Sequence, residues 1–260
     1  MNASQRLPVP VSLRRWVDHV ELAAYRTDDD GCPLIHAPNP ATTLVWRTTA
    51  NGSSSLLVVG PRTHATYHDS KEIPVCARFQ LAPGAARALL GTPIDEITDR
   101  VIPLSDLWGR SGTRLAHELD EFVGQPTAAA EHIASALAER AQSVRPEDNT
   151  ATDLVRRASV ELSPRDDHPR PRVNEVAQNM SVSERHLRAA FTAAVGVPLK
   201  QFARLARLRS ILPRLHHEPW ASLASSAGYY DQSHMIAQFR EAMHVTPRAF
   251  TAGRLPTVAC

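Results

Sequence analysis

The segment VNEVAQNMSVSERHLRAAF, residues 173–191, decides how the C-terminal part of the chain folds. Ser183 is a favourable helix N-cap, and Glu184 follows it in the positive first turn. The residues before Ser183 carry an apolar stripe at helical spacing, formed by Val173, Val176, Ala177 and Met180. The pattern therefore predicts a helix, a tight turn at Asn179 and Ser181, and a second helix.

The second helix of this segment has an apolar back and a basic front. At about 100° per residue, Leu187 and Phe191 share one face. The opposite face carries Arg185, Arg188 and Thr192. A helix that is held on its apolar back by a preceding helix, with long polar side chains outward, has the geometry that enters a DNA major groove. Any surface helix of a bundle is also amphipathic, so this segment alone leaves both interpretations open.

The same arrangement recurs in WASLASSAGYYDQSHMIAQFREAM, residues 220–243. Gly228 supplies the turn and Asp231 the cap, and Met235 and Phe239 share an apolar face. The opposite face carries Ser233, Ala237 and Arg240. The recurrence predicts a second helix-turn-helix unit and favours the DNA-binding interpretation.

Residues 198–217, PLKQFARLARLRSILPRLHH, connect the two units. Pro198 suits a first helical turn, and an apolar side is formed by Phe202, Leu205, Leu208 and Leu212. A helix of about 20 residues would be roughly 30 Å long, close to the ~34–36 Å of one DNA turn. Two recognition helices on such a rod could enter adjacent major grooves. Pro213 is expected to kink or end the rod.

Residues 172–250 resemble the DNA-binding domain of the AraC family of bacterial transcription regulators. The resemblance rests on residues 173–191, on GVPLKQFARLARLRS (196–210) and on LASSAGYYDQSHMIAQFREAMHVTPRAF (223–250). The last piece is the most specific, because G-Y-x-D-Q-S-H-x-x-x-x-F-R followed by T-P-x-x-F is close to the family signature. The resemblance implies two helix-turn-helix units joined by a linker helix, with DNA contacts from both recognition helices.

Carried onto this sequence, the resemblance implies a set of DNA-binding side chains. The expected base contacts come from Arg185, Arg188 and Thr192 in the first recognition helix and from Gln232, Ser233 and His234 in the second. The expected phosphate contacts come from Arg240, Arg204 and Arg207. An arginine can donate two hydrogen bonds to guanine, a contact worth about 1–3 kcal/mol of discrimination, and a glutamine can pair with adenine.

Alternatives remain open for several of these residues. The linker-helix arginines Arg204, Arg207 and Arg209 could form internal ion pairs instead. His234 and His186 could pack on the helix surface instead of contacting bases. The sequence also departs from the family pattern: Ser181 and His244 stand where glycine is frequent, so those turns are expected to be strained or differently built. Ala189 stands where a polar DNA-contacting residue is frequent.

The first half of the chain is predicted to be a β-rich α+β domain. Short β-branched runs bounded by turn residues predict strands at 42–46, 55–59 and 75–81. After Trp108 apolar residues recur at helical spacing, which predicts helices.

Residues 163–172, SPRDDHPRPR, contain three prolines and have no apolar face, which predicts a linker. The expected domains are therefore residues 1–162, regulatory or dimerising, and residues 163–260, an all-α DNA-binding domain.

The charge of the chain is polarised about this linker. Residues 1–163 hold 16 Lys and Arg against 20 Asp and Glu, whereas residues 164–260 hold 13 against 7. The net charges are −4 and +6, which favours a polyanion as partner of the C-terminal part. Solvated surface arginines are the alternative explanation.

Residues 9–110 also resemble, less specifically, an N-terminal domain that accompanies this helix-turn-helix in actinobacteria. The pieces are VVGPRTHATYH (58–68) and LAPGAARALLGTPIDEITDRVIPLSDLWG (81–109). The ligands of that domain are unassigned. We expect a module that controls the DNA-binding domain through a small molecule or through self-association. The competing hypothesis is a constitutive or protein-partnered regulator.

Metal binding and catalysis are not expected. His64 and His68, with Cys76 or His36 nearby, could be zinc ligands, but positions four apart in a strand are about 13 Å apart, too far to share one ion. The sequence has no G-x-S-x-G elbow, Walker loop, G-x-G-x-x-G after a strand or H-E-x-x-H. Nothing therefore indicates an enzyme or a cofactor.

Three cysteines, Cys32, Cys76 and Cys260, are too few and scattered for a disulfide framework.

Trp46, Tyr67 and Trp108 could line a ligand pocket, but core packing is the preferred interpretation.

The expected partners follow from the regulator hypothesis. They are double-stranded promoter DNA, a small-molecule effector, a second copy of the chain in a homodimer, and RNA polymerase if the protein is an activator.

No window approaches the roughly 18 consecutive apolar residues of a membrane span, and the N-terminus lacks a leader pattern. The sequence therefore predicts a bacterial cytoplasmic protein without membrane contact.

Overall fold

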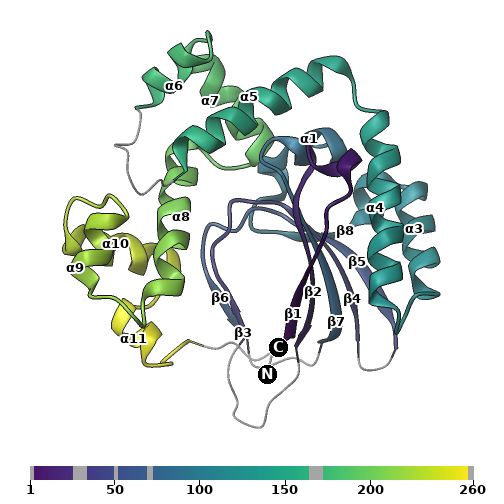
Figure 1. Ribbon diagram of the computed structural model, residues 1–260, viewed down its shortest axis with the longest axis horizontal. Helices are drawn as coiled ribbons and strands as arrows, with labels where there is room; N and C mark the ends of the chain where they lie inside the picture. The colour runs from purple at the N-terminus through teal and green to yellow at the C-terminus, as the bar shows by residue number, and fades with distance from the viewer. Residues whose placement is uncertain (1–2, 26–33, 50–51, 69–72, 164–171, 257–260) are drawn as a thin grey trace.

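The computed structural model describes residues 3–25, 34–49, 52–68, 73–163 and 172–256. Strands form its N-terminal half and helices its C-terminal half (Figure 1). The strands are β1 (Ala3–Leu7), β2 (Val17–Tyr25), β3 (Leu34–His36), β4 (Thr43–Thr48), β5 (Ser54–Val59), β6 (Thr66–His68), β7 (Ile73–Leu81) and β8 (Val101–Pro103). The predicted fold class, a β-rich α+β region followed by an all-α region with two helix-turn-helix units, is confirmed.

The helices fall into two groups along the chain. Those of the first group are the 3-10 helices η1 (Val11–Leu13) and η2 (Ile94–Ile97) with α1 (Ala85–Leu90), α2 (Leu104–Trp108), α3 (Arg110–Asp120), α4 (Pro126–Gln142) and α5 (Pro146–Leu162). Those of the second are α6 (Val173–Asn179), α7 (Glu184–Val195), α8 (Leu199–Ile211), η3 (Leu212–Arg214), α9 (Trp220–Ser226), α10 (Gln232–Met243) and α11 (Pro247–Thr251). None of the helices among the described residues is long and apolar enough to cross a bilayer.

Six strands form one antiparallel sheet in the order β1-β2-β7-β4-β5-β8, and β3 pairs separately with β6. The three predicted strands are confirmed, since they lie within β4, β5 and β7 except for a one-residue overhang at Thr42. The pairs Leu44↔Phe79 and Trp46↔Ala77 set the register of β4 against β7. Because side chains alternate along a strand, these four residues share one face of the sheet and Val45, Arg47, Cys76 and Arg78 share the other.

The first face of the sheet carries the main hydrophobic core. Helices α1, α3 and α4 pack on it, and Trp46 and Phe79 are fully buried there. Trp108 packs on the edge of this core and donates its indole N–H to the carbonyl oxygen of Leu89 at 3.0 Å. The preferred interpretation of Trp46 and Trp108 as packing residues is thus confirmed. The opposite face is left for a cavity, described below.

Helix α5 belongs to the core of the first helix-turn-helix unit. Its residues Val155, Ala158 and Leu162 form one buried cluster with Leu187 and Phe191 of α7. The helix was expected to lie within the N-terminal domain, and its end thus packs on the part of the chain expected to be the next domain. Residues 164–171 of the predicted linker lie outside the described residues.

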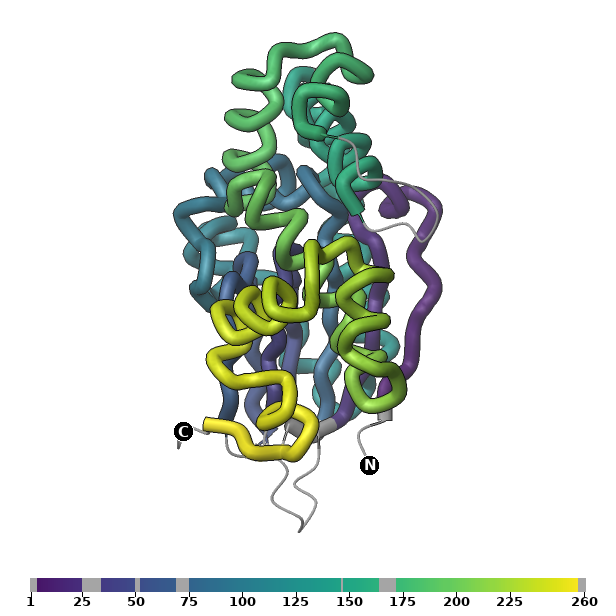
Figure 2. Tube along the Cα trace, turned by 90° about the vertical axis from the view of Figure 1, so that its left-hand side faces the viewer, coloured from purple at the N-terminus to yellow at the C-terminus, as the bar shows by residue number. Residues whose placement is uncertain are grey.

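The two helix-turn-helix units lie at opposite ends of α8 along one side of the sheet (Figures 1 and 2). The first unit, α6 with α7, lies near α1 and α5, and the second, α9 with α10, lies beside β6. Both units therefore contact the N-terminal part of the chain, which matters for how the recognition helices α7 and α10 are held.

Candidate nucleic-acid interface and the adjoining cavity

Helix α7 is built as its sequence predicts. The Ser183 hydroxyl caps it by accepting the backbone N–H of His186 at 3.1 Å. Leu187 and Phe191 are fully buried. Arg185 and Arg188 are exposed on the opposite side, and Thr192 is half-buried. The structure therefore brings both arginines onto one solvent-facing front near the N-terminus of α7.

Arg188 is not free of partners on that front. Its guanidinium pairs with the carboxylate of Glu184 one turn earlier, with Nε 2.8 Å from Oε1. Both side chains are about half exposed, so the pair contributes only about 0.3–0.5 kcal/mol. DNA could displace Glu184 at small cost.

Helix α10 repeats the design. The Asp231 carboxylate caps it by accepting the backbone N–H of His234 at 2.7 Å. Met235 and Phe239 are fully buried. Ser233, Ala237 and Arg240 lie on one exposed face, and Gln232 is exposed at the start of the helix. The predicted contact residues of the second unit are thus accessible, except for His234.

His234 is half-buried and engaged within the protein. Its Nδ1 lies 3.3 Å from the backbone N–H of Tyr230, its Nε2 contacts the side chain of Gln238, and its ring meets Tyr229 edge-on at 5.8 Å. These contacts are those of the packing alternative. The base-contact role of His234 stays a prediction.

Two arginines of α8 hold the second unit. Arg204 pairs with Glu241 of α10. Arg207 lies over the ring of Tyr229 at 5.2 Å and donates to the carbonyl oxygen of Gly228 at 3.4 Å; burial lowers its pKa. These intramolecular contacts favour the bracing alternative, and the phosphate role of both arginines stays a prediction.

Arg209 on the same helix reaches the N-terminal part of the chain. Its guanidinium donates to the carbonyl oxygen of Pro38 at 3.4 Å, and burial, with the nearby charge of Arg78, lowers its pKa. Arg209 therefore links α8 to the sheet.

Two turns adopt the left-handed backbone without glycine. Ser181 has φ +56° and His244 has φ +55°, the region that glycine enters without strain. The expectation of strain at these positions is thus supported by the backbone itself.

The rod between the units is shorter than expected. Helix α8 has 13 residues, whereas about 20 were expected. At the usual rise per residue its length is about 20 Å. Pro213 falls in the 3-10 turn η3 that follows, because it cannot supply the N–H that would continue the helix. The predicted break at Pro213 is confirmed, and the predicted length was wrong.

The C-terminal end of α7 is fastened to the segment around η2. Gly196 ends the helix with φ +84°, and its carbonyl oxygen accepts the Thr98 hydroxyl at 2.9 Å. A Cβ at Gly196 would lie 2.8 Å from Ile94 Cγ2 and from Thr98 Oγ1. Only glycine fits this contact without displacement, so α7 is seated closely on residues 94–98.

The C-terminal end of α10 is fastened to β6. The carbonyl oxygen of Ala242 accepts the backbone N–H of Ala65 at 2.7 Å, and that of Met243 accepts the Tyr67 hydroxyl at 2.6 Å. The ring of His244 stacks on His64 with centroids 5.0 Å apart. Tyr67 is therefore a buried anchor for a recognition helix and not part of a ligand pocket.

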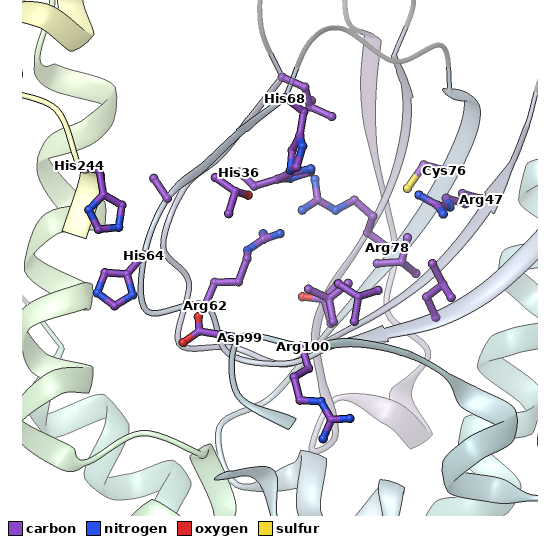
Figure 3. A pocket seen from close by; sticks show the side chains of 18 residues that line it. His36, Arg47, Arg62, His64, His68, Cys76, Arg78, Asp99, Arg100 and His244 are labelled. Atoms are coloured by element: carbon purple, nitrogen blue, oxygen red, sulfur yellow. The ribbon is translucent and has the colours of Figure 1, made fainter. Parts of the chain in front are cut away.

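A cavity of about 610 Å³ lies between the second face of the sheet and the β3-β6 pair. Its apolar wall includes Val45, Leu57 and Val59, and its polar wall includes Arg47, Arg62, Arg78, His36, His68 and Asp99 (Figure 3). His64 to Thr66, beside the end of α10, contribute to the wall, and so do Asp99 to Val101, which directly follow the segment that holds α7. His244 of the DNA-binding domain lines it too.

The suspected zinc residues do not converge. His64 stacks on His244, whereas His68 faces His36 with ring centroids 5.4 Å apart. Cys76 lies on the far wall, and burial raises the pKa of its thiol to about 11. Within the described ranges, no group of three His, Cys, Asp or Glu side chains is placed to hold a metal ion.

Two structural features escaped sequence reasoning. Tyr230 is 91% exposed beside the N-terminus of α10, whereas its neighbour Tyr229 is buried. The cavity arginines were also missed. The sequence holds one signal for these arginines. Because side chains alternate along Val45-Trp46-Arg47 and Cys76-Ala77-Arg78, Arg47 and Arg78 lie on the face of the sheet opposite Trp46.

Two capped helices, each held on its apolar back by a preceding helix, define a DNA-binding protein of the helix-turn-helix class. A family model described as a helix-turn-helix domain matches residues 176–253. The match covers the residues whose sequence resembles the DNA-binding domain of the AraC family, and it shows that this part of the chain is a helix-turn-helix domain.

Curated proteins and solved structures were also compared with the chain, and they show only weak similarity. No curated protein matches the chain. The C-terminal domain of AraT, a response regulator from Geobacillus stearothermophilus, is 22% identical over 40% of this chain and 88% of its own, with a TM-score of 0.36. ToxT from Vibrio cholerae O395 is 10% identical over 90% of this chain and 97% of its own, with a TM-score of 0.44. Unsaturated fatty acid bound ToxT from Vibrio cholerae strain SCE256 is 12% identical over 100% and 97%, with a TM-score of 0.41. These scores are too low to support further inference.

Proposed function

We propose that this protein is a sequence-specific transcription regulator that reads promoter DNA with α7 and α10 in adjacent major grooves, under the control of its N-terminal part. The base-reading residues are Arg185, Arg188 and Thr192 on α7 and Gln232 and Ser233 on α10. Arg240 contacts phosphate, with Arg204 and Arg207 bracing the helices that present these residues.

The observation that carries the proposal is that both recognition helices leave their N-terminal fronts exposed while their backs and C-terminal ends are buried. A helix presented in this way can enter the major groove with the residues of its first turns. The basic C-terminal part of the chain, with net charge +6 over residues 164–260, supports the same partner.

Control by a small molecule is supported by the cavity. Its wall includes residues 64–66, at which α10 ends, and residues 99–101, which directly follow the segment at which α7 ends, so an occupant could favour one arrangement of α7 and α10 over another. Coupling of this kind requires that the occupant bind the two arrangements with different affinity. We place the protein in the bacterial cytoplasm, where such regulators meet DNA and RNA polymerase.

Selection of bound duplexes from random DNA, followed by footprinting at a stated salt concentration, tests the DNA-binding part. We expect two protected groups of bases on one side of the duplex, spaced by about one helical turn. Absence of any enriched sequence would refute the proposal. A thermal-shift screen with small metabolites tests the control part, because a ligand of the folded state raises the melting temperature with its concentration.

A further inference from the structure

We propose that Tyr230 is a further DNA-contacting residue of the second unit, and that its hydroxyl donates a hydrogen bond to a phosphate oxygen beside the bases that α10 reads. His234 is the residue that holds Tyr230 in place for this contact. The inference rests on the proposed function, because it adds one contact and one positioning residue to the DNA interface assigned to α10.

Tyr230 is not a packing residue. Its side chain is 91% exposed, although it directly precedes Asp231, the cap of α10. An apolar residue at that position often packs against the fourth residue of the helix, which is here Met235. Met235 is fully buried without help from Tyr230. In the first unit the equivalent residue, Val182, takes the usual role, because it is half-buried and packs on the same core as Leu187.

The backbone around Tyr230 is fixed on both sides. Tyr229, the residue before it, is buried, and its N–H bonds to the carbonyl oxygen of Ala224 at 2.9 Å. The N–H of Tyr230 bonds to Nδ1 of His234 at 3.3 Å, and Asp231, the residue after it, accepts the N–H of His234 at 2.7 Å. A tyrosine side chain on such a backbone has few rotatable bonds left to order, so it can make a contact at low entropic cost.

The bond from Tyr230 defines the tautomer of His234. A backbone N–H can only donate, so Nδ1 carries no proton and the ring proton of the neutral imidazole lies on Nε2. Nε2 faces the amide of Gln238, whose Oε1 is buried without a hydrogen-bond partner among the described residues. With its amide turned so that Oε1 faces the ring, Gln238 accepts this proton. His234 is then tied at both ring nitrogens, and it acts on DNA through Tyr230.

The charges at this end of α10 favour a neutral donor. Helix α7 carries Arg185 and Arg188 in its first turns, whereas the first arginine of α10 is Arg240, about 14 Å along the axis from the cap at the usual rise. The Asp231 carboxylate already caps the N-terminus of α10, and its charge disfavours a phosphate placed directly on the helix end. A hydroxyl that projects from the neighbouring residue avoids this repulsion, and tyrosine is among the residues that contact phosphate oxygens.

The place of Tyr230 in the chain indicates a phosphate and not a base as its partner. A recognition helix enters the major groove with its first residues, which are here Gln232 and Ser233. Tyr230 lies before the cap and outside the helix, at the edge of the groove where the sugar–phosphate backbone runs. Phosphate contacts fix the register of a protein on the duplex and carry no sequence information. We therefore expect Tyr230 to strengthen binding to any duplex.

The contact is tested by fluorescence anisotropy of the full-length protein on the selected duplex and on a scrambled one, over a series of salt concentrations. Tyr230→Phe removes only the hydroxyl and should raise Kd about tenfold on both duplexes. The salt slope should stay unchanged, because a neutral donor releases no counterion, whereas the loss of an arginine contact lowers the slope by about one. Thr127→Val, which removes an exposed hydroxyl from α4 on the other side of the molecule (Figure 1), is the matched control and should change neither Kd.

The positioning role of His234 is tested by two substitutions at this residue. The amide oxygen of asparagine can replace Nδ1 as acceptor of the Tyr230 N–H, so His234→Asn should stay within about twofold of the native Kd. His234→Ala lacks the acceptor and should weaken binding, by no more than Tyr230→Phe does. In the Tyr230→Phe background, His234→Ala should cause no further loss, because both substitutions remove the same contact.

The outcomes separate this inference from the proposed function. If the native protein gives the two-part footprint and Tyr230→Phe binds both duplexes as the native protein does, the contact is refuted and the proposed function stands. A loss confined to the selected duplex would refute the phosphate as partner. Additive losses from the two alanine and phenylalanine substitutions, or a His234→Asn variant as weak as His234→Ala, would refute the positioning role. A native protein without any footprint would remove the proposed function and this inference together.

Discussion

Replacing Arg188 by alanine separates a base contact from a phosphate contact on α7. In the free protein the Arg188 guanidinium is paired with Glu184, an exposed interaction worth about 0.3–0.5 kcal/mol. A two-bond contact with guanine contributes about 1–3 kcal/mol of discrimination. After allowing for the lost pair, Arg188→Ala should weaken binding to the selected duplex by about 0.5–2.5 kcal/mol, or roughly 2- to 70-fold in Kd.

The assay is fluorescence anisotropy on the selected duplex and on a scrambled one, repeated over a series of salt concentrations. We expect the loss on the selected duplex to exceed the loss on the scrambled one. Glu184→Gln supplies a second comparison: it frees Arg188 and should strengthen binding about twofold. Arg114→Ala on α3 is the control for a lost surface charge and should leave both duplexes unaffected.

Two results would refute the base-contact assignment. Equal losses on both duplexes, together with a salt slope reduced by about one, would make Arg188 a phosphate ligand. No loss on either duplex would mean that this side of α7 does not meet DNA.

The remaining predictions concern stability and are measured by denaturant unfolding. Gly196→Ala should lower the free energy of unfolding by about 2–3 kcal/mol, because φ is +84° and a Cβ would lie 2.8 Å from Ile94. Gly253→Ala, with φ +67° and open space around the site, should cost only about 1 kcal/mol, and equal losses would contradict the seating of α7. Ser181→Gly should raise the free energy of unfolding by about 0.5–1 kcal/mol by relieving the left-handed turn; a decrease would show that the turn is built otherwise. Burial raises the pKa of Tyr67 to about 12, so its stabilising contribution is complete below pH 10 and is lost as pH rises through 12. Tyr67→Phe should be less stable at neutral pH and should lack this alkaline loss, and an unchanged profile would exclude Tyr67 as the anchor of α10.

Local features of the DNA-binding domain could be predicted from the sequence. The caps Ser183 and Asp231 and the buried pairs that follow them at helical spacing were all anticipated, because each depends on residues within one or two turns. The break at Pro213 was anticipated for the same reason. The length of α8 was overestimated, since the expected rod included all of residues 198–217, past Pro213, whereas the helix ends at Ile211.

Features that depend on distant pairings could not be predicted. The stacking of His64 on His244 joins residues 180 positions apart. The Thr63 to Asp99 bonds depend on how the β5-β8 and β3-β6 pairs lie relative to each other. Alternation along β4 and β7 indicated which side chains share a face, but it did not show that the face opposite Trp46 encloses a cavity. The spacing of residues along one sequence does not indicate which of the many compatible strand pairings forms.

The fastening of α7 and α10 at their far ends has a consequence for how such regulators diverge. Under the proposed function, a change in the exposed front of either helix would alter which bases are preferred and would leave the separation between the two contacted groups of bases unchanged. That separation would depend on the N-terminal part of the chain, because both helices end on it. Substitutions at Gly196 or Tyr67 would therefore change the separation between the two contacted groups of bases. They would leave the preference for particular bases unchanged.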